Sequence, residues 1–141
     1  MIQHILLATD GSASAERAAD FAASLGSRYG AKVTVLHVYS PAPSYVDKAT
    51  GNRRCYSTSG NAKALAMNVA EHLREVGVSD VDTEILEGPV VRAILNGAKS
   101  RKPDLLVLGS RGSGTGSGGM LLGSVTMAVT YRAECPVLVV K

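Results

Sequence analysis

Residues 104–125 run Asp-Leu-Leu-Val-Leu-Gly-Ser-Arg-Gly-Ser-Gly-Thr-Gly-Ser-Gly-Gly-Met-Leu-Leu-Gly-Ser-Val, and this stretch decides which fold the chain can adopt. It opens with a short apolar run that ends at Gly109, and a helical pattern follows Gly123. A continuous apolar run is typical of a parallel strand that is covered on both faces. Residues 109–124 are therefore predicted to form a glycine-rich loop between a buried strand and a helix.

The same alternation of short apolar runs and helical patterns extends over residues 1–141, which we expect to form one domain. Strands are predicted at 2–9, 33–39, 81–86, 104–109 and 136–141, and helices at 14–29, 61–76, 90–100 and 123–133. This order predicts an open, doubly wound α/β fold with a five-stranded parallel sheet, right-handed crossovers and helices on both faces. We expect the strand order 3-2-1-4-5, and the alternating pattern of 81–86 suits an edge strand.

Several residues predict where the helices begin and end. Ser12 or Ser14 can cap the first helix, Gly30 can end it, and Pro89 suits a first-turn position because that position needs no N–H. The second helix is expected to repeat one stripe of residues: Ala64, Leu65, Asn68, Val69, His72, Leu73 and Val76. Residues 40–60, with little periodicity, predict a mobile excursion and no second domain.

Composition and charge exclude several classes of protein. The net charge of +3 is mild and its basic residues are scattered, so nucleic acid is not an expected partner. Cys55 and Cys135 lack the spacing of a metal site, and we expect Cys135 to be a small core residue. The N-terminus has no basic start, and no apolar run reaches the roughly 20 residues of a membrane helix. A reduced, cytoplasmic protein without a membrane partner is expected.

The glycine-rich segment has the chemistry of a phosphate-binding loop. Its glycines include Gly109, Gly112, Gly114 and Gly123, and they allow close approach of the backbone N–H groups to a ligand. A helix N-terminus favours anions, Ser124 and Thr126 could add hydroxyls, and Arg111 could add a cation. The alternative is a flexible Gly/Ser linker. A Walker A loop is excluded, because no lysine occurs between residues 102 and 141.

Asp10 follows the first strand and could supply the opposite wall of the same site. Ligands of open parallel sheets bind outside the carboxyl ends of the strands, where the strand order reverses. In the order 3-2-1-4-5 the first and fourth strands form that point, so Asp10 and Gly109 would face one crevice. Asp10 could accept hydrogen bonds from a ribose or lie near a phosphate-bound metal. Its alternative role is that of a turn or capping aspartate.

Five blocks of sequence, in the expected order, resemble the universal stress protein family over essentially the whole chain. They are residues 5–12 (ILLATDGS), 36–38 (LHV), 104–112 (DLLVLGSRG), 121–125 (LLGSV) and 135–140 (CPVLVV). The resemblance implies an α/β domain that binds an adenine nucleotide and is usually a homodimer. In the ATP-binding branch, the glycine pattern corresponds to Gly109, Gly112, Gly123 and Ser124, but residues 113–122 are one longer than that pattern.

The resemblance also assigns roles to individual residues. Ala8, Thr9 and Asp10 would line the adenosine, and the backbone of Val38 would meet the adenine. The phosphates and ribose would lie against Gly109, Arg111, Gly112, Gly114, Gly123, Ser124 and Val125. The cofactor would be ATP, with Mg²⁺ or Mn²⁺ held through its phosphates and no separate metal site. The last strand, an apolar edge, would pair with its copy in a second subunit through Val137, Leu138, Val139 and Val140.

Three functions stay open on the sequence alone. A nucleotide-binding, stress-response regulatory protein with little or no turnover is favoured. The alternatives are a slow ATP hydrolase or nucleotidyl transferase and a nucleotide-independent dimeric interaction protein. No Ser–His–Asp or paired-carboxylate pattern supports an enzyme. His37 lies in an apolar run and is expected to be a core histidine, His4 and His72 have no partner suggested by spacing, and Glu84 is expected at the surface.

Overall fold

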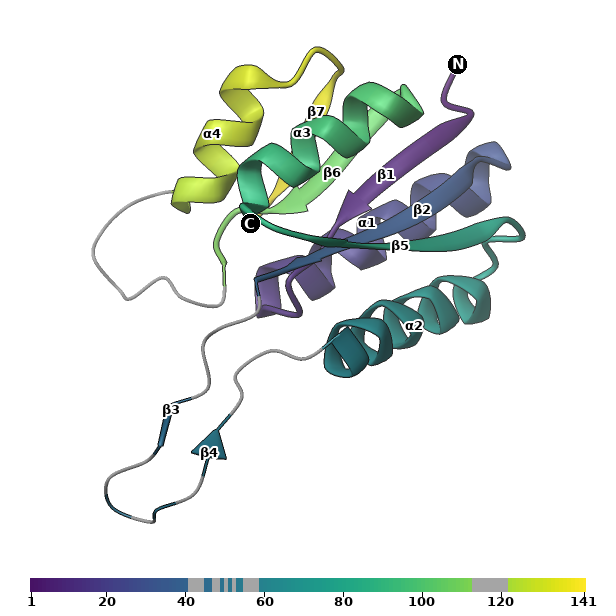
Figure 1. Cartoon of the computed structure of the whole chain (residues 1–141). Coiled ribbons are helices and arrows are strands. Elements are labelled where there is room, and N and C mark those ends of the chain that lie inside the picture. Colours follow the sequence, from purple (N-terminus) through teal and green to yellow (C-terminus); the bar gives the residue numbers. More distant parts are fainter. Residues whose placement is uncertain (41–44, 47–48, 50, 52, 55–58, 113–121) are drawn as a thin grey trace.

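A parallel five-stranded sheet forms the centre of the protein (Figure 1). The structure, a computed structural model, describes residues 1–40, 45–46, 49, 51, 53–54, 59–112 and 122–141. The elements are β1 (His4–Ala8), α1 (Ala13–Tyr29), β2 (Lys32–Tyr39), β3 (Tyr45–Val46), β4 (Arg53–Arg54), α2 (Ser59–Val76), β5 (Val81–Glu87), α3 (Val90–Arg101), β6 (Leu105–Gly109), α4 (Ser124–Arg132) and β7 (Val137–Val140).

The strand order of the sheet is β5-β2-β1-β6-β7, and every neighbouring pair is parallel. In terms of the five predicted strands this is the order 3-2-1-4-5, which confirms the prediction. The strands β3 and β4 form a separate antiparallel pair that the sequence analysis did not anticipate. They lie between β2 and α2, within the predicted excursion.

Side chains along one strand alternate between two apolar cores. Ile5 and Leu7 of β1 pack with residues of α1 and α2, whereas Leu6 and Ala8 pack with residues of α3 and α4. All four are less than a tenth exposed. Figure 1 shows the corresponding helix pairs on opposite faces of the sheet. Burial of both faces explains why the strand sequence is apolar without interruption.

The helix boundaries follow local chemistry. Ser12 is the N-cap of α1 and its side chain accepts from the Ala15 N–H, while Gly30 ends the helix with a left-handed φ of 63°. Ser14, the other candidate for the cap, instead forms hydrogen bonds with the backbone of Arg111. Pro89 is the N-cap of α3 and precedes its first turn, so the predicted position is off by one residue.

The predicted buried stripe of α2 is partly wrong. The helix buries Ala62, Ala66, Ala70 and Leu73, whereas Ala64, Asn68, His72 and Val76 are exposed. Three of the four buried residues are alanines four apart, which allow the helix backbone to lie close to the sheet. The predicted stripe would have buried an amide and an imidazole, which is costly unless each finds a hydrogen-bond partner.

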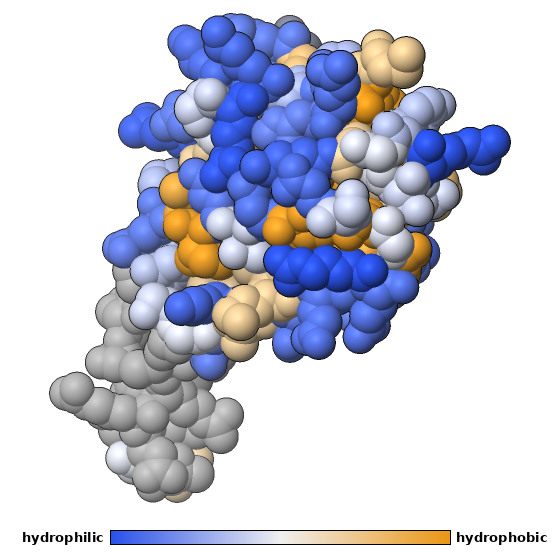
Figure 2. Space-filling view, turned by 90° about the vertical axis from the view of Figure 1, so that its right-hand side faces the viewer, coloured by the Kyte–Doolittle hydropathy of each residue, from blue (hydrophilic) through white to orange (hydrophobic). Residues whose placement is uncertain are grey.

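The face at which the strands begin is mainly hydrophilic. Figure 2 shows this end of the molecule, with separate apolar areas between polar side chains. Among the described residues, no helix combines the length and the apolar character that a membrane crossing requires.

Candidate ligand cleft

A cleft of about 460 Å³ lies at the carboxyl ends of β1, β2 and β6. It lies at the point where the strand order reverses, as expected for an open parallel sheet. The predicted site residues that line it are Ala8, Thr9, Asp10, Val38, Gly109, Arg111, Gly112, Gly123, Ser124 and Val125. Gly114 lies outside the described residues. Nine further residues line the cleft without having been predicted to do so, although Thr126 was considered as a source of a hydroxyl: Ala15, Leu36, His37, Tyr39, Ser40, Val90, Ile94, Leu108 and Thr126.

Two serines join the loops that follow β1 and β6. The Ser14 hydroxyl donates to the Arg111 carbonyl at 2.7 Å, and Ser12 donates to the same carbonyl at 3.1 Å. The Arg111 N–H in turn donates to the Ser14 hydroxyl oxygen at 3.2 Å. Ser14 is only 5% exposed, so its two bonds are partly shielded from water, whereas the Ser12 bond is exposed. The two halves of the predicted site are therefore fixed relative to each other by side chains of α1 and its cap.

Asp10 has a local structural role. Its Oδ1 accepts from the Ser12 N–H at 2.9 Å, which is the geometry of an Asx turn. The turn role is thus observed. The side chain is exposed and lines the cleft, so the carboxylate is placed where a ligand could reach it.

The glycines of the β6–α4 segment are needed for contacts within the protein. A Cβ on Gly109 would lie 2.4 Å from Ser14 Oγ and 2.7 Å from the Ala15 nitrogen. A Cβ on Gly123 would lie 3.3 Å from the Gly112 nitrogen. From the sequence alone, these glycines were expected to allow close approach of a ligand. The structure adds a second cause. Gly109 lies close to the start of α1, and Gly123, at one end of the loop, lies close to Gly112 at the other end.

The first turn of α4 borders the cleft with uncapped amides. Gly123 is its N-cap and provides no side-chain bond, while its own N–H donates to the Ser110 carbonyl at 2.6 Å. The amides of a first helical turn have no partner within the helix and favour anions. The predicted role of the Thr126 hydroxyl is wrong, because it donates to the Gly109 carbonyl at 2.7 Å and joins α4 to β6.

His37 was predicted to be a core histidine, but the structure places it at the wall of the cleft. Its ring is half-buried and lines the cleft, and Nδ1 lies 2.7 Å from the Thr9 carbonyl oxygen. It is satisfied by a hydrogen bond, as expected, but at the wall of a cleft. The sequence signal that could have indicated this was its position near the carboxyl end of β2, beside the switch point.

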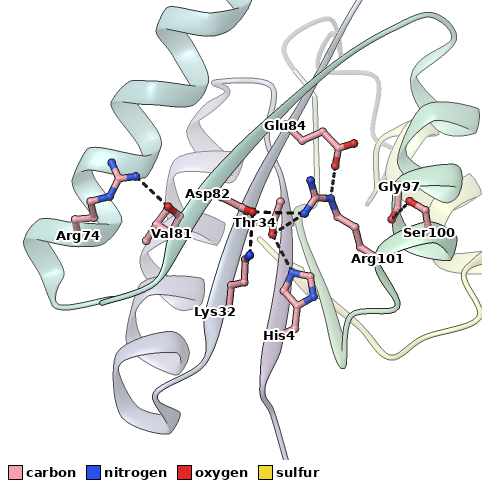
Figure 3. A network of polar contacts seen from close by, with 10 residues as sticks. All are labelled: His4, Lys32, Thr34, Arg74, Val81, Asp82, Glu84, Gly97, Ser100 and Arg101. Atoms are coloured by element: carbon pink, nitrogen blue, oxygen red, sulfur yellow. Dashed lines mark hydrogen bonds and ion pairs between the residues drawn. The ribbon is translucent and has the colours of Figure 1, made fainter.

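A second polar cluster lies away from the cleft, near the starts of β1 and β2 (Figure 3). His4 Nε2 lies 2.9 Å from the Thr34 hydroxyl, and Lys32 pairs with Asp82 at 3.0 Å. Arg101 pairs with Glu84 and lies 3.6 Å from Asp82. Spacing suggested no partner for His4, and the structure supplies Thr34; Glu84 lies on the edge strand as expected but is only 23% exposed. His72 also has a partner, Asp20 at 2.8 Å.

The cluster changes the proton affinity of two of its members. Burial, together with the charge of Lys32, lowers the pKa of His4. Burial would raise the pKa of Asp82, but hydrogen bonds from Thr34 and Lys32, together with nearby positive charge, outweigh this effect and lower it. Acidification therefore lowers the stability of the folded state at both groups, because folding disfavours the protonation of His4 and of Asp82.

The described chain contains no group of three or more His, Cys, Asp or Glu side chains arranged to hold a metal ion. Cys135 packs against the α3–α4 core, and burial raises the pKa of its thiol. A thiol with a raised pKa is a poor nucleophile, which agrees with the expected packing role. Cys55 lies outside the described residues.

The fold and the cleft define a class: a doubly wound α/β domain with a ligand cleft at its switch point. Within this class the chain belongs to the universal stress protein family, whose family model matches residues 1–141. It is 37% identical over 146 aligned positions to the universal stress protein in the QAH/OAS sulfhydrylase 3′ region of Thermus aquaticus, with complete coverage of both chains.

Two solved structures share the fold closely. The hypothetical protein MJ0577 is 28% identical, with a TM-score of 0.80 and coverage of 100% of this chain and 96% of that chain. A universal stress protein in complex with cAMP is 30% identical, with a TM-score of 0.75 and coverage of 99% and 96%. The resemblance inferred from the five sequence blocks is thus confirmed at the level of the family.

Proposed function

We propose that this protein binds ATP in the cleft between the β1–α1 and β6–α4 loops and acts as a cytoplasmic stress-response regulator with little or no turnover. The observation that carries the proposal is the meeting of Asp10, the Val38 backbone and the uncapped start of α4 around one cleft. A similar protein solved with cAMP supports an adenine nucleotide as the ligand class.

The cleft offers different chemistry at its two ends. At one end the apolar residues Leu36, Val90 and Ile94 could pack against a base, and the backbone of Val38 could meet its edge. At the other end the amides of Ser124 and Val125, with the guanidinium of Arg111, could hold phosphates. Asp10 also lines the cleft and would accept hydrogen bonds from the ribose. A Mg²⁺ or Mn²⁺ ion would be held through the phosphates.

Wild-type protein is expected to bind ATP in calorimetry, and Asp10→Ala is expected to weaken binding about tenfold, the worth of one charge-assisted hydrogen bond. Gly123→Val should weaken binding too, because its side chain would press on the Gly112 nitrogen and shift the loop. Asp20→Ala is the matched control, since Asp20 is an exposed carboxylate of α1 that pairs with His72.

Two results would change the proposal. If the wild type bound neither ATP, ADP nor AMP, the nucleotide-independent interaction protein would be favoured. Phosphate release well above that of Gly123→Val would indicate the slow hydrolase instead.

A homodimer through β7 is also part of the proposal. β7 is an edge of the sheet, and its residues Val137, Leu138 and Val139 are half-buried. The Pro136 carbonyl accepts from the Leu106 N–H of β6, and the Val140 carbonyl accepts from the Ser110 N–H just after β6. Val139 therefore belongs to the alternate row whose N–H points outward. We expect Val139→Pro to give a monomer in sedimentation without loss of the sheet, because it removes only an outward donor. Val139→Ala keeps that donor and should stay dimeric; a monomeric wild type at micromolar concentration would contradict the dimer.

A further inference from the structure

One row of backbone amides on β2 faces β1. The Lys32 N–H donates to the Gln3 carbonyl, and the Leu36 carbonyl accepts from the Thr9 N–H, both at 2.9 Å. In a parallel ladder every second residue of a strand points its N–H and C=O to the same neighbour. Val38 is next in this row, and continuation of the ladder would pair its N–H with the Thr9 carbonyl.

The His37 ring forms a hydrogen bond with the Thr9 carbonyl instead. A carbonyl can only accept, so the contact of 2.7 Å means that Nδ1–H of His37 donates to the Thr9 oxygen. Within the described part of the chain, no backbone amide donates to this oxygen. The ladder between β1 and β2 therefore stops at Thr9, and the backbone of Val38 is left at the wall of the cleft.

We infer that His37 is a positioning residue that ends the β1–β2 ladder and so keeps the Val38 N–H available for a purine edge. The inference rests on the proposed function. The N–H and C=O of one strand residue point the same way, so Val38 presents a donor beside an acceptor. This pair matches adenine, which offers N1 as acceptor and its 6-amino group as donor. Hypoxanthine has N1–H and a 6-oxygen, the reverse pattern, and leaves both groups unmatched.

The test compares ATP with inosine triphosphate by calorimetry in three proteins. Wild type should prefer ATP. His37→Leu removes the donor, so the Thr9 carbonyl can recruit the Val38 N–H; ATP affinity should fall roughly tenfold and the preference over inosine triphosphate should shrink by a similar factor. His37→Asn should restore both, because its amide nitrogen lies as many bonds from the backbone as Nδ1. His72→Leu, which alters a histidine on α2, should match wild type.

A second readout needs no nucleotide. In the unliganded wild type the Val38 amide should exchange its hydrogen faster than the ladder amides before it, and His37→Leu should slow that exchange. A protected Val38 amide in wild type would overturn the inference, as would a His37→Leu variant with unchanged ATP affinity and base preference, or one that His37→Asn fails to rescue. Those outcomes leave the proposed function standing if wild type binds ATP; a wild type that binds no adenine nucleotide overturns both.

Discussion

Gly109→Ala should lower the free energy of unfolding by about 3 kcal/mol, the upper range for overpacking a buried site. The added Cβ would meet Ser14 Oγ at 2.4 Å and the Ala15 backbone nitrogen at 2.7 Å. The backbone of α1 cannot move away without breaking the bonds from Ser12 and Ser14 to the Arg111 carbonyl. Urea denaturation measures the change, and the melting temperature should fall by roughly 10 °C.

Gly112→Ala provides the matched control in the same loop. Among the described residues, its Cβ would meet only Asp10 Oδ2, at 3.0 Å, and this is the end of an exposed side chain that can shift. Stability should therefore change by less than about 1 kcal/mol, while the displaced carboxylate should weaken ATP binding. Equal stability losses in the two variants would show that the contact of Gly109 with α1 is not what requires glycine there.

The strands were predictable because each depends on a local signal that the sequence carries directly, and the location of the cleft follows from the expected strand order. Continuous apolar runs indicated strands covered on both faces, and Ile5 and Leu6 indeed enter opposite cores. Ser12 and Gly30 act as predicted, since capping needs only neighbouring residues. The stripe of α2 was predicted correctly only at Leu73, because alanines that pack closely against a sheet give a weaker periodic signal than larger apolar residues.

The candidate site was predictable in its parts but not in its connections. Asp10 and Gly109 were expected to share a crevice, and both line it. The bond from Ser14 to Arg111 joins residues 97 positions apart, and no local sequence pattern predicts such a pair. The roles of His37 and Thr126 were missed for the same reason. Each side chain satisfies a carbonyl on another element, at Thr9 and Gly109 respectively, and only the folded chain brings these groups together.

Arg101→Met should lower the free energy of unfolding by about 2 kcal/mol at pH 7, mostly because it leaves Glu84 without its charged partner. The Glu84 side chain is 23% exposed and that of Arg101 28%, so water can replace only part of the lost interaction. The methionine keeps an apolar stem of similar length while it removes the charge. Neutral pH is the right condition, because the stabilisation from Asp82 is present above its ordinary pKa and is lost as the pH falls through the lowered one.

The double variant Glu84→Leu with Arg101→Met tests whether the stability loss of Arg101→Met comes from the unpaired Glu84 carboxylate or from other lost contacts of Arg101. If the cost of Arg101→Met comes from leaving a carboxylate unpaired, removal of that carboxylate should recover most of the stability. Glu84→Leu alone should be less harmful than Arg101→Met, because the remaining guanidinium still lies 3.6 Å from Asp82. Additive losses in the double variant would contradict this account, and would mean that Arg101 stabilises the protein through packing rather than through its ion pair. ATP affinity should stay unchanged in all three variants, because Arg101 and Glu84 do not line the cleft.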